Sequence, residues 1–266
     1  MRIAIVLLAF LPLSILHAET VPVRYGQGTV HGFLVIHNEQ GQLIATGDSI
    51  QVAQGDHIST RLLFHFRDGS IDDETAVYSQ QKEFRLISDH HIQKGPSFPK
   101  PMDMLVEANG DVTTKTTAKD GTEKVTKDHL DLPPDIANGL VSVYLQNLPA
   151  HSAGISVGMI VSTPKPRLVT LAIAPVGDVA IRVGGVRRKA TDYRIKIDLG
   201  GVAGVVAPLI GKQPKDIHLL ILDGEAPVFL REIGQFYADG PVWTVEQTSA
   251  VFPRESAAQA SPKAAH

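Results

Sequence analysis

Short runs in which apolar and polar residues alternate occupy most of this sequence. In the run 58–66, Leu62 and Phe64 would lie on one face of a strand, and Leu63 and His65 on the other. Such period-two alternation is typical of a strand with one buried face. Turn residues recur at short intervals between the runs, and this spacing favours an antiparallel meander over βαβ units.

The runs predict a series of strands joined by tight turns. Asn109-Gly110, one of the stronger hairpin signals, separates the predicted strands 102–107 and 112–117. The other predicted strands span residues 30–36, 43–46, 58–66, 84–92, 155–162, 168–174, 179–183, 191–199, 217–222, 228–232 and 242–248. No repeat of fixed length links these runs, so we expect neither a propeller nor a solenoid.

One segment departs from the alternation and predicts a helix over 133–148. Asp131 would cap this helix, Pro133 and Pro134 suit its first turn, and Pro149 would end it. The apolar residues that share one face at helical spacing are Ile136, Leu140, Val143, Tyr144 and Leu148.

Together these elements predict a mostly β protein. A sheet of this length must curl or split to cover its apolar face, so we expect an antiparallel curved sheet or half-barrel, with the helix 133–148 packed on the concave face. The expected packing partners of the helix are Phe64, Phe66, Ile195 and Ile197. We expect a single domain over 19–253 and a disordered tail over 254–266, which is rich in Ala, Ser and Gln.

The first 18 residues have the layout of a secretory signal peptide. Arg2 is followed by a mostly apolar run to Leu16, and Ala18 offers a small residue before Glu19. This run is too short for a membrane span, and no other apolar run approaches the required length of about 20 residues. We therefore expect an exported protein, in the periplasm or outside the cell, without a transmembrane anchor.

Composition narrows the classes of function. The chain has no Cys, which excludes disulfides, thiol catalysis, Cys-ligated metals and a lipid-modified Cys. Its formal net charge is −3 with scattered Lys and Arg, so no nucleic acid partner is expected. The densest basic run, Arg187-Arg188-Lys189, is interpreted as the solvated tip of a hairpin.

Two polar clusters invite a metal-site interpretation that their spacing does not support. His90 and His91 are adjacent, so on a strand they point to opposite faces, whereas Asp89 and His91 share a face. The acidic segment 68–74 lacks the ligand order of a calcium loop and is interpreted as an acidic turn. We therefore predict no metal ligand and no cofactor.

The signatures of catalytic and phosphate sites are incomplete. Gly154-Ile-Ser-Val-Gly158 has the spacing of a nucleophile elbow, but Ser156 begins a predicted strand and lacks a strand–turn–helix context. The Gly-rich segment 200–212 has Val206 where a phosphate loop needs Gly. A glycoside-cleaving cleft would need a pair of carboxylates, for which Glu74, Glu107 and Glu225 are candidates. The reaction depends on the distance between the two groups in the folded protein, which the sequence does not give. We predict no catalytic residue.

Two segments resemble a family of uncharacterised bacterial exported proteins. They are Asp131-Leu-Pro-Pro-Asp-Ile-Ala-Asn-Gly139 and Gly240-Pro-Val-Trp-Thr-Val-Glu246. This resemblance covers most of the mature chain and brings no known activity. The layout of strands around one helix is also similar to the curved half-barrels of periplasmic lipoprotein carriers, and that resemblance implies an architecture without assigning a function.

A half-barrel around a loosely packed helix would enclose an apolar cavity. Our hypothesis is an exported, non-enzymatic protein that binds or shuttles a lipid-like hydrophobic ligand. The predicted ligand-binding residues are Ile136, Leu140, Val143, Tyr144 and Leu148, with Val205 and Leu209 in a mobile lip. The alternatives are a structural or interaction module that meets an envelope protein partner, and a hydrolase of envelope polymers.

Overall fold

The structure is a computed structural model that describes residues 20–117, 121–149, 152–163, 165–183, 185–200 and 214–250. In this part of the chain, fourteen strands form one antiparallel sheet in the order β8-β7-β6-β5-β4-β3-β2-β1-β14-β13-β12-β11-β10-β9. Neighbouring strands are consecutive along the chain except β1 and β14, so the first and last strands meet within the sheet. The predicted mostly β, antiparallel class is confirmed.

Several strands begin and end where the alternation predicts. The first eight are β1 (Val30–His37), β2 (Leu43–Gln54), β3 (His57–Phe66), β4 (Ile71–Gln80), β5 (Phe84–Lys94), β6 (Met102–Glu107), β7 (Asp111–Thr117) and β8 (Glu123–His129). The other six are β9 (Ile155–Thr163), β10 (Lys165–Val183), β11 (Val186–Asp198), β12 (Ile217–Leu222), β13 (Val228–Gln235) and β14 (Val242–Thr248). The Asn109-Gly110 hairpin between β6 and β7 is confirmed, and Gly110 has the positive φ of +95° that favours glycine there.

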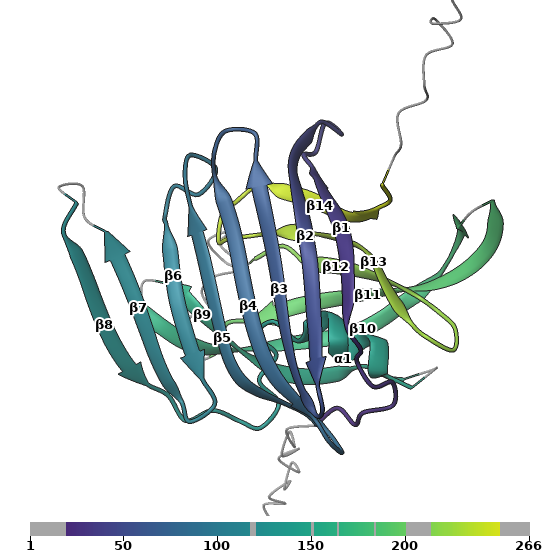
Figure 1. Cartoon of the computed structure of the whole chain (residues 1–266), viewed down its shortest axis with the longest axis horizontal. Coiled ribbons are helices and arrows are strands. Elements are labelled where there is room, and N and C mark those ends of the chain that lie inside the picture. The colour runs from purple at the N-terminus through teal and green to yellow at the C-terminus, as the bar shows by residue number, and fades with distance from the viewer. Residues whose placement is uncertain are drawn as a thin grey trace, which may run out of the picture.

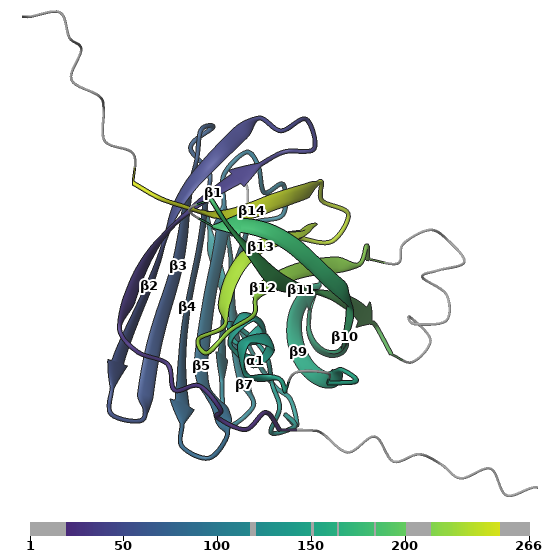
Figure 2. The same cartoon turned by 90° about the vertical axis from the view of Figure 1, so that its right-hand side faces the viewer.

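The sheet curls so that its two halves face each other. In Figure 1, β2–β8 run side by side across the front of the molecule, and β9–β14 cross behind them. Figure 2 shows α1 (Val141–Asn147) inside the curve, between the β2–β5 wall and β9. The predicted half-barrel with a helix on its concave face is confirmed, and it stays open because β8 and β9 are the two edges of the sheet.

The helix is shorter than the predicted 133–148. Gly139 has a left-handed backbone, with φ of +63°, which a right-handed helix does not accommodate. Before it, Ile136 forms a parallel bridge with Gly158, so this part of the segment pairs with β9 instead of coiling. The helical stretch is therefore confined to α1, and the predicted first two turns are wrong.

The segment before α1 covers the edge of the sheet at β9. The backbone N–H of Ala137 donates to the Gly158 carbonyl at 2.8 Å. The Asn138 side-chain oxygen accepts from the N–H of Ile160 at 2.8 Å, and its amide nitrogen donates to the Ile160 carbonyl at 3.0 Å. One side chain thus satisfies both edge-facing backbone groups of Ile160, as a neighbouring strand would.

Two apolar clusters form the core. The larger one surrounds α1 and holds Leu140 and Tyr144 together with Ile195, as predicted. Phe64 and Phe66 belong to the smaller cluster, around Trp243, so their predicted packing against the helix is wrong. The reason is the direction of β3, which carries its last residues to the part of the sheet where β1 and β14 pair.

Some predictions fall outside the described residues. They concern the signal peptide 1–18, the lip residues Val205 and Leu209, and the tail 254–266. Among the residues that are described, no helix has both the length and the apolar character needed to cross a bilayer.

Candidate functional site

A cavity of about 460 Å³ lies between the two halves of the sheet, beside α1. Its apolar walls include Leu34, Leu62, Phe64, Val143, Leu171, Ile195, Leu219 and Phe229. Uncharged polar groups on other parts of the wall include Ser49, Gln51, Thr60, Gln146 and Gln247. Its volume lies within the range of about 300–1,000 Å³ that is usual for small-molecule pockets.

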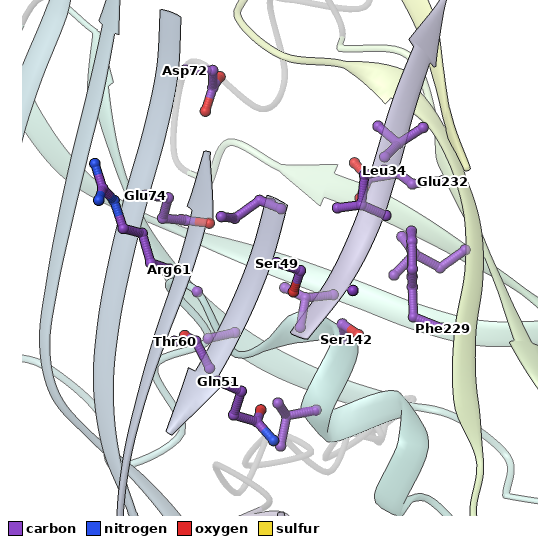
Figure 3. Close-up of a pocket in the computed structure, with 18 of the residues that line it drawn as sticks. Leu34, Ser49, Gln51, Thr60, Arg61, Asp72, Glu74, Ser142, Phe229 and Glu232 are labelled. Atoms are coloured by element: carbon purple, nitrogen blue, oxygen red, sulfur yellow. The ribbon is translucent and has the colours of Figure 1, made fainter. Parts of the chain in front are cut away.

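The charged part of the wall comes mainly from β4 and β5. Glu74 of β4 lies directly opposite His91 of β5, and Asp72 lies opposite Gln93. Because side chains alternate along a strand, all four point to the concave side of the sheet, where they line the cavity. Figure 3 shows Glu74 directed into the cavity, whereas Arg61 of the neighbouring β3 points to the other side.

His91 is held by carboxylates on β4. Its Nε2 lies 3.0 Å from Asp72 Oδ1, and its Nδ1 lies 3.9 Å from Glu74 Oε1. The second oxygen of Asp72 accepts a hydrogen bond from Gln93 Nε2 at 2.7 Å. Burial alone would lower the pKa of His91, but the charges of Asp72, Glu74 and Asp89 together raise it to about 10. The imidazole is therefore cationic at neutral pH and is paired with Asp72.

Asp89 lies on the same concave side as His91, two residues earlier on β5. The side chain is buried, with the residue only 1% exposed. Its Oδ2 accepts a hydrogen bond of 3.4 Å from Asn138 Nδ2, whereas Oδ1 has no hydrogen-bond partner among the described residues. Burial and the charge of Glu74 raise the pKa of Asp89 well above its usual value.

Glu232 of β13 brings a further carboxylate from the opposite half of the sheet. It lies opposite Leu219 of β12 and Val245 of β14, and all three side chains line the cavity. Burial, together with the charges of Glu74 and Asp72, raises the pKa of Glu232 to about 7. Burial, opposed in part by the charge of His91, also raises the pKa of Glu74. We call Asp72, Glu74 and Glu232, the carboxylates that line the cavity, its acidic end; Asp89 is buried and is not part of the lining.

The predicted ligand-binding residues lie mostly beneath this cavity. Val143 lines the cavity from α1. Ile136, Leu140, Tyr144 and Leu148 are buried in the larger apolar cluster, where they support the wall.

Sequence reasoning missed the acidic end because it interpreted 68–74 as a turn. The turn covers only Arg67 to Ser70, and β4 begins at Ile71, so Asp72 and Glu74 lie on a strand. The signal was available in the buried Ala76 and Tyr78, which continue the same alternation after Asp72 and Glu74. No local sequence pattern predicts that Glu232 shares the cavity with Asp72 and Glu74, because this depends on how the sheet curls.

The other candidate groups stay apart. His90 points away from His91, as predicted, and its Nε2 lies 2.9 Å from Asp103 Oδ1. Ser156 lies within β9, which confirms its predicted strand context. Glu107 and Glu225 do not line the cavity with Glu74. Within the described ranges, no three His, Asp or Glu side chains are grouped so that they could hold a metal ion.

The basic run 187–189 lies on the β10–β11 hairpin, as predicted. Its residues are exposed, and Arg187 lies directly opposite Arg182 on the facing strand. Lys189 Nζ forms ion pairs with Asp178 at 3.2 Å and with Asp223 at 3.1 Å.

Fold and site together define a class: an open antiparallel half-barrel with an internal cavity that is apolar along most of its wall and acidic at one end. No protein-family model matches the chain, and no curated protein matches it in sequence. Among solved structures, a beta-barrel-like protein of the domain of unknown function DUF1849 from Brucella abortus is similar, with a TM-score of 0.44 and 8% identity. That match covers 89% of this chain and 100% of the other.

Proposed function

We propose that this protein binds a lipid-like hydrophobic small molecule in the cavity, as a carrier or binding protein and not as an enzyme. The observation that carries the proposal is the cavity itself, which lies between two sheet walls lined by Leu, Ile and Phe side chains. Burying an alkyl chain there would contribute about 0.8 kcal/mol per methylene. In this proposal the ligand is met in the periplasm or outside the cell, because residues 1–18 have the layout of a secretory signal.

A substitution that fills the cavity tests this proposal. Ser49 lines the cavity from β2, and the next residue, Ile50, is 40% exposed on the opposite face. We expect Ser49→Trp to weaken binding of the neutral hydrophobic dye N-phenyl-1-naphthylamine at least about tenfold, because the indole would occupy the dye's space. The control Ile50→Trp adds the same ring outside and should leave the dissociation constant unchanged. Equal binding by both variants would overturn the proposal.

Native mass spectrometry on protein purified from its host separates the proposal from the alternatives. A reproducible adduct of lipid mass, absent from Ser49→Trp, is the expected result. An interaction module needs no occupant in the cavity, so a clean apo mass together with a co-purified envelope protein would favour that function. A hydrolase would leave fragments of an envelope polymer in place of an intact lipid.

A further inference from the structure

The acidic end of the cavity has more carboxylates than cationic groups to balance them. Asp72, Glu74 and Glu232 line the cavity together, and the described cationic side chains in its lining are His91 and Arg61. Arg61 does not contribute, because its guanidinium binds both oxygens of Asp73 on the outer face, at 2.9 and 2.8 Å. His91 is thus the one cation among the described residues that faces these acids.

His91 does not neutralise Glu74 and Glu232, because it is already paired with Asp72. Its Nε2 binds Asp72 at 3.0 Å, and the longer approach of Nδ1 to Glu74, 3.9 Å, is beyond hydrogen-bond distance. In the described part of the chain, the carboxylate of Glu232 has neither a hydrogen-bond nor an ion-pair partner. Glu232 therefore presents an unpaired acid to the cavity from β13.

A further carboxyl near the acidic end also lacks a complete set of hydrogen bonds. Asp89 is buried, and its Oδ1 is a hydrogen-bond acceptor without a partner among the described residues. Asp89 does not itself line the cavity, but Gly139 does, and a Cβ built at Gly139 would lie 3.4 Å from Asp89 Oδ1. An unpaired acceptor this close to the cavity favours a positively charged group there over an anion.

We infer that the ligand of the cavity carries a protonated amine, which binds at the acidic end between Glu232 and Glu74, while its apolar body lies along Leu34, Leu219 and Phe229. This inference rests on the proposed function and adds the chemical class of the head group. An ammonium supplies up to three N–H donors and one positive charge, which match the unpaired carboxylate of Glu232 and that of Glu74, whose approach to His91 is long at 3.9 Å. A ligand that ends in a carboxylate or a phosphate would instead be repelled.

Binding of an amine at the acidic end should depend on pH in one direction. The charged groups that line the cavity with Glu232 are Glu74 and Asp72 from β4 and His91 from β5, while the polar side chains that α1 contributes are Ser142 and Gln146. Because the pKa of Glu232 is about 7, its charge is largely lost at acidic pH. Amine binding should therefore strengthen from about pH 5.5 to about pH 8.5, and it should release protons near pH 6.

The test compares three ligands with the same twelve-carbon chain: dodecylamine, dodecanol and dodecanoate. Calorimetric titration of the full chain is done at about pH 8, where the alkylamine is protonated and the ligands are kept below their micelle concentrations. We expect dodecylamine to bind at least about tenfold more tightly than dodecanol, and dodecanoate more weakly than dodecanol. Glu232→Gln should reduce the advantage of the amine over the alcohol to less than threefold.

The control is Glu246→Gln, which removes a carboxylate from the outer face of β14, beside Arg231, and should keep the preference for the amine. If Glu232→Gln does not fold, as judged by Trp243 emission, Glu74→Gln and the pH dependence of wild-type binding replace it. Equal affinity for all three ligands would overturn the inference and leave the proposed function standing. Failure of every ligand to bind would overturn both.

Discussion

At Gly139, beside the cavity, the fold depends on the absence of a side chain. A Cβ at this position would lie 2.4 Å from the Cβ of Ala76, and the backbone has φ of +63°. We expect Gly139→Ala to lower the free energy of unfolding by about 2–5 kcal/mol, from strain in the left-handed backbone and from overpacking against β4. Urea denaturation followed by circular dichroism measures this loss.

The matched control for this substitution is Gly41→Ala. Gly41 also has a positive φ, +73°, but a Cβ there would meet no atom within 4 Å. Its cost should be limited to the backbone term of about 1–2 kcal/mol. If both variants lose the same stability, close packing between Gly139 and Ala76 is not what the fold requires.

The acidic end makes stability depend on pH in a defined direction. The pKa values of Glu232, about 7, and His91, about 10, are both above the unfolded values of about 4.5 and 6.5, so the folded chain holds these protons more tightly. Their contribution to stability is complete at low pH. It is lost between about pH 4.5 and 7 through Glu232, and between about pH 6.5 and 10 through His91.

Glu232→Gln should therefore gain stability relative to wild type as the pH rises from about 4.5 to 7, by roughly 2–4 kcal/mol. His91→Gln should show a larger relative gain, because the pKa difference is larger, but only between about pH 6.5 and 10. Chemical denaturation of the three proteins across this range gives the difference curves. Difference curves that stay flat across both ranges would mean that these groups titrate alike in the folded and unfolded chain.

Single residues were predictable from the sequence where the strand period alone decides their position. Adjacent His90 and His91 had to point to opposite faces, and Asp89 had to share the face of His91. The partner of His91, Asp72, was hidden because Asp68-Gly69-Ser70 forms a genuine turn immediately before β4. Composition suggested a continuous acidic turn, whereas the backbone leaves that turn after Ser70.

At the scale of elements, the loop between β5 and β6 acts as a plug for the smaller apolar cluster. Phe98 in this loop is 1% exposed, and its ring centroid lies 5.9 Å from that of Trp243 and 5.3 Å from that of Phe66. Phe98→Ala should destabilise the protein by about 3–5 kcal/mol, through lost contacts and the cavity that remains. Trp243, the one Trp of the chain, should report the change as a red shift of its emission.

Phe33→Ala provides the comparison, because Phe33 is 44% exposed on the outer face of β1. Its cost should stay within about 0.5 kcal/mol, without a shift in Trp243 emission. Equal losses from Phe98→Ala and Phe33→Ala would mean that the loop is a passive connection.

The helix shows why element boundaries were harder to predict than element types. The spacing of Ile136 and Leu140 fits a helical face, yet Ile136 is buried from an isolated bridge to β9 that turns precede and follow. Periodicity records which side chains are buried, and a short bridge followed by a turn can bury the same ones. Pairing with the edge strand β9 favours the bridge over the helix, and the local sequence does not reveal this pairing.

At the scale of the whole molecule, the meander was predictable and its curvature was not. Every neighbouring pair of strands except β1–β14 is joined by the next stretch of chain, so alternation and turn signals were enough to place most of the sheet. The cavity arises because β13 and β4, far apart in the order of strands, face each other across the curl. That approach is set by twist summed over many strands, which no local pattern encodes.

An open sheet also has two unpaired borders, and each border could recruit a second molecule into a growing aggregate. Asn138 blocks part of one of them, at β9, since its amide occupies both edge-facing backbone groups of Ile160. The other border, β8, bears Glu123, Lys124, Lys127 and Asp128 within seven residues, and such charges resist stacking of one copy on another. The amide beside the cavity wall thereby also leaves the backbone of Ile160 unable to pair with a strand of another copy.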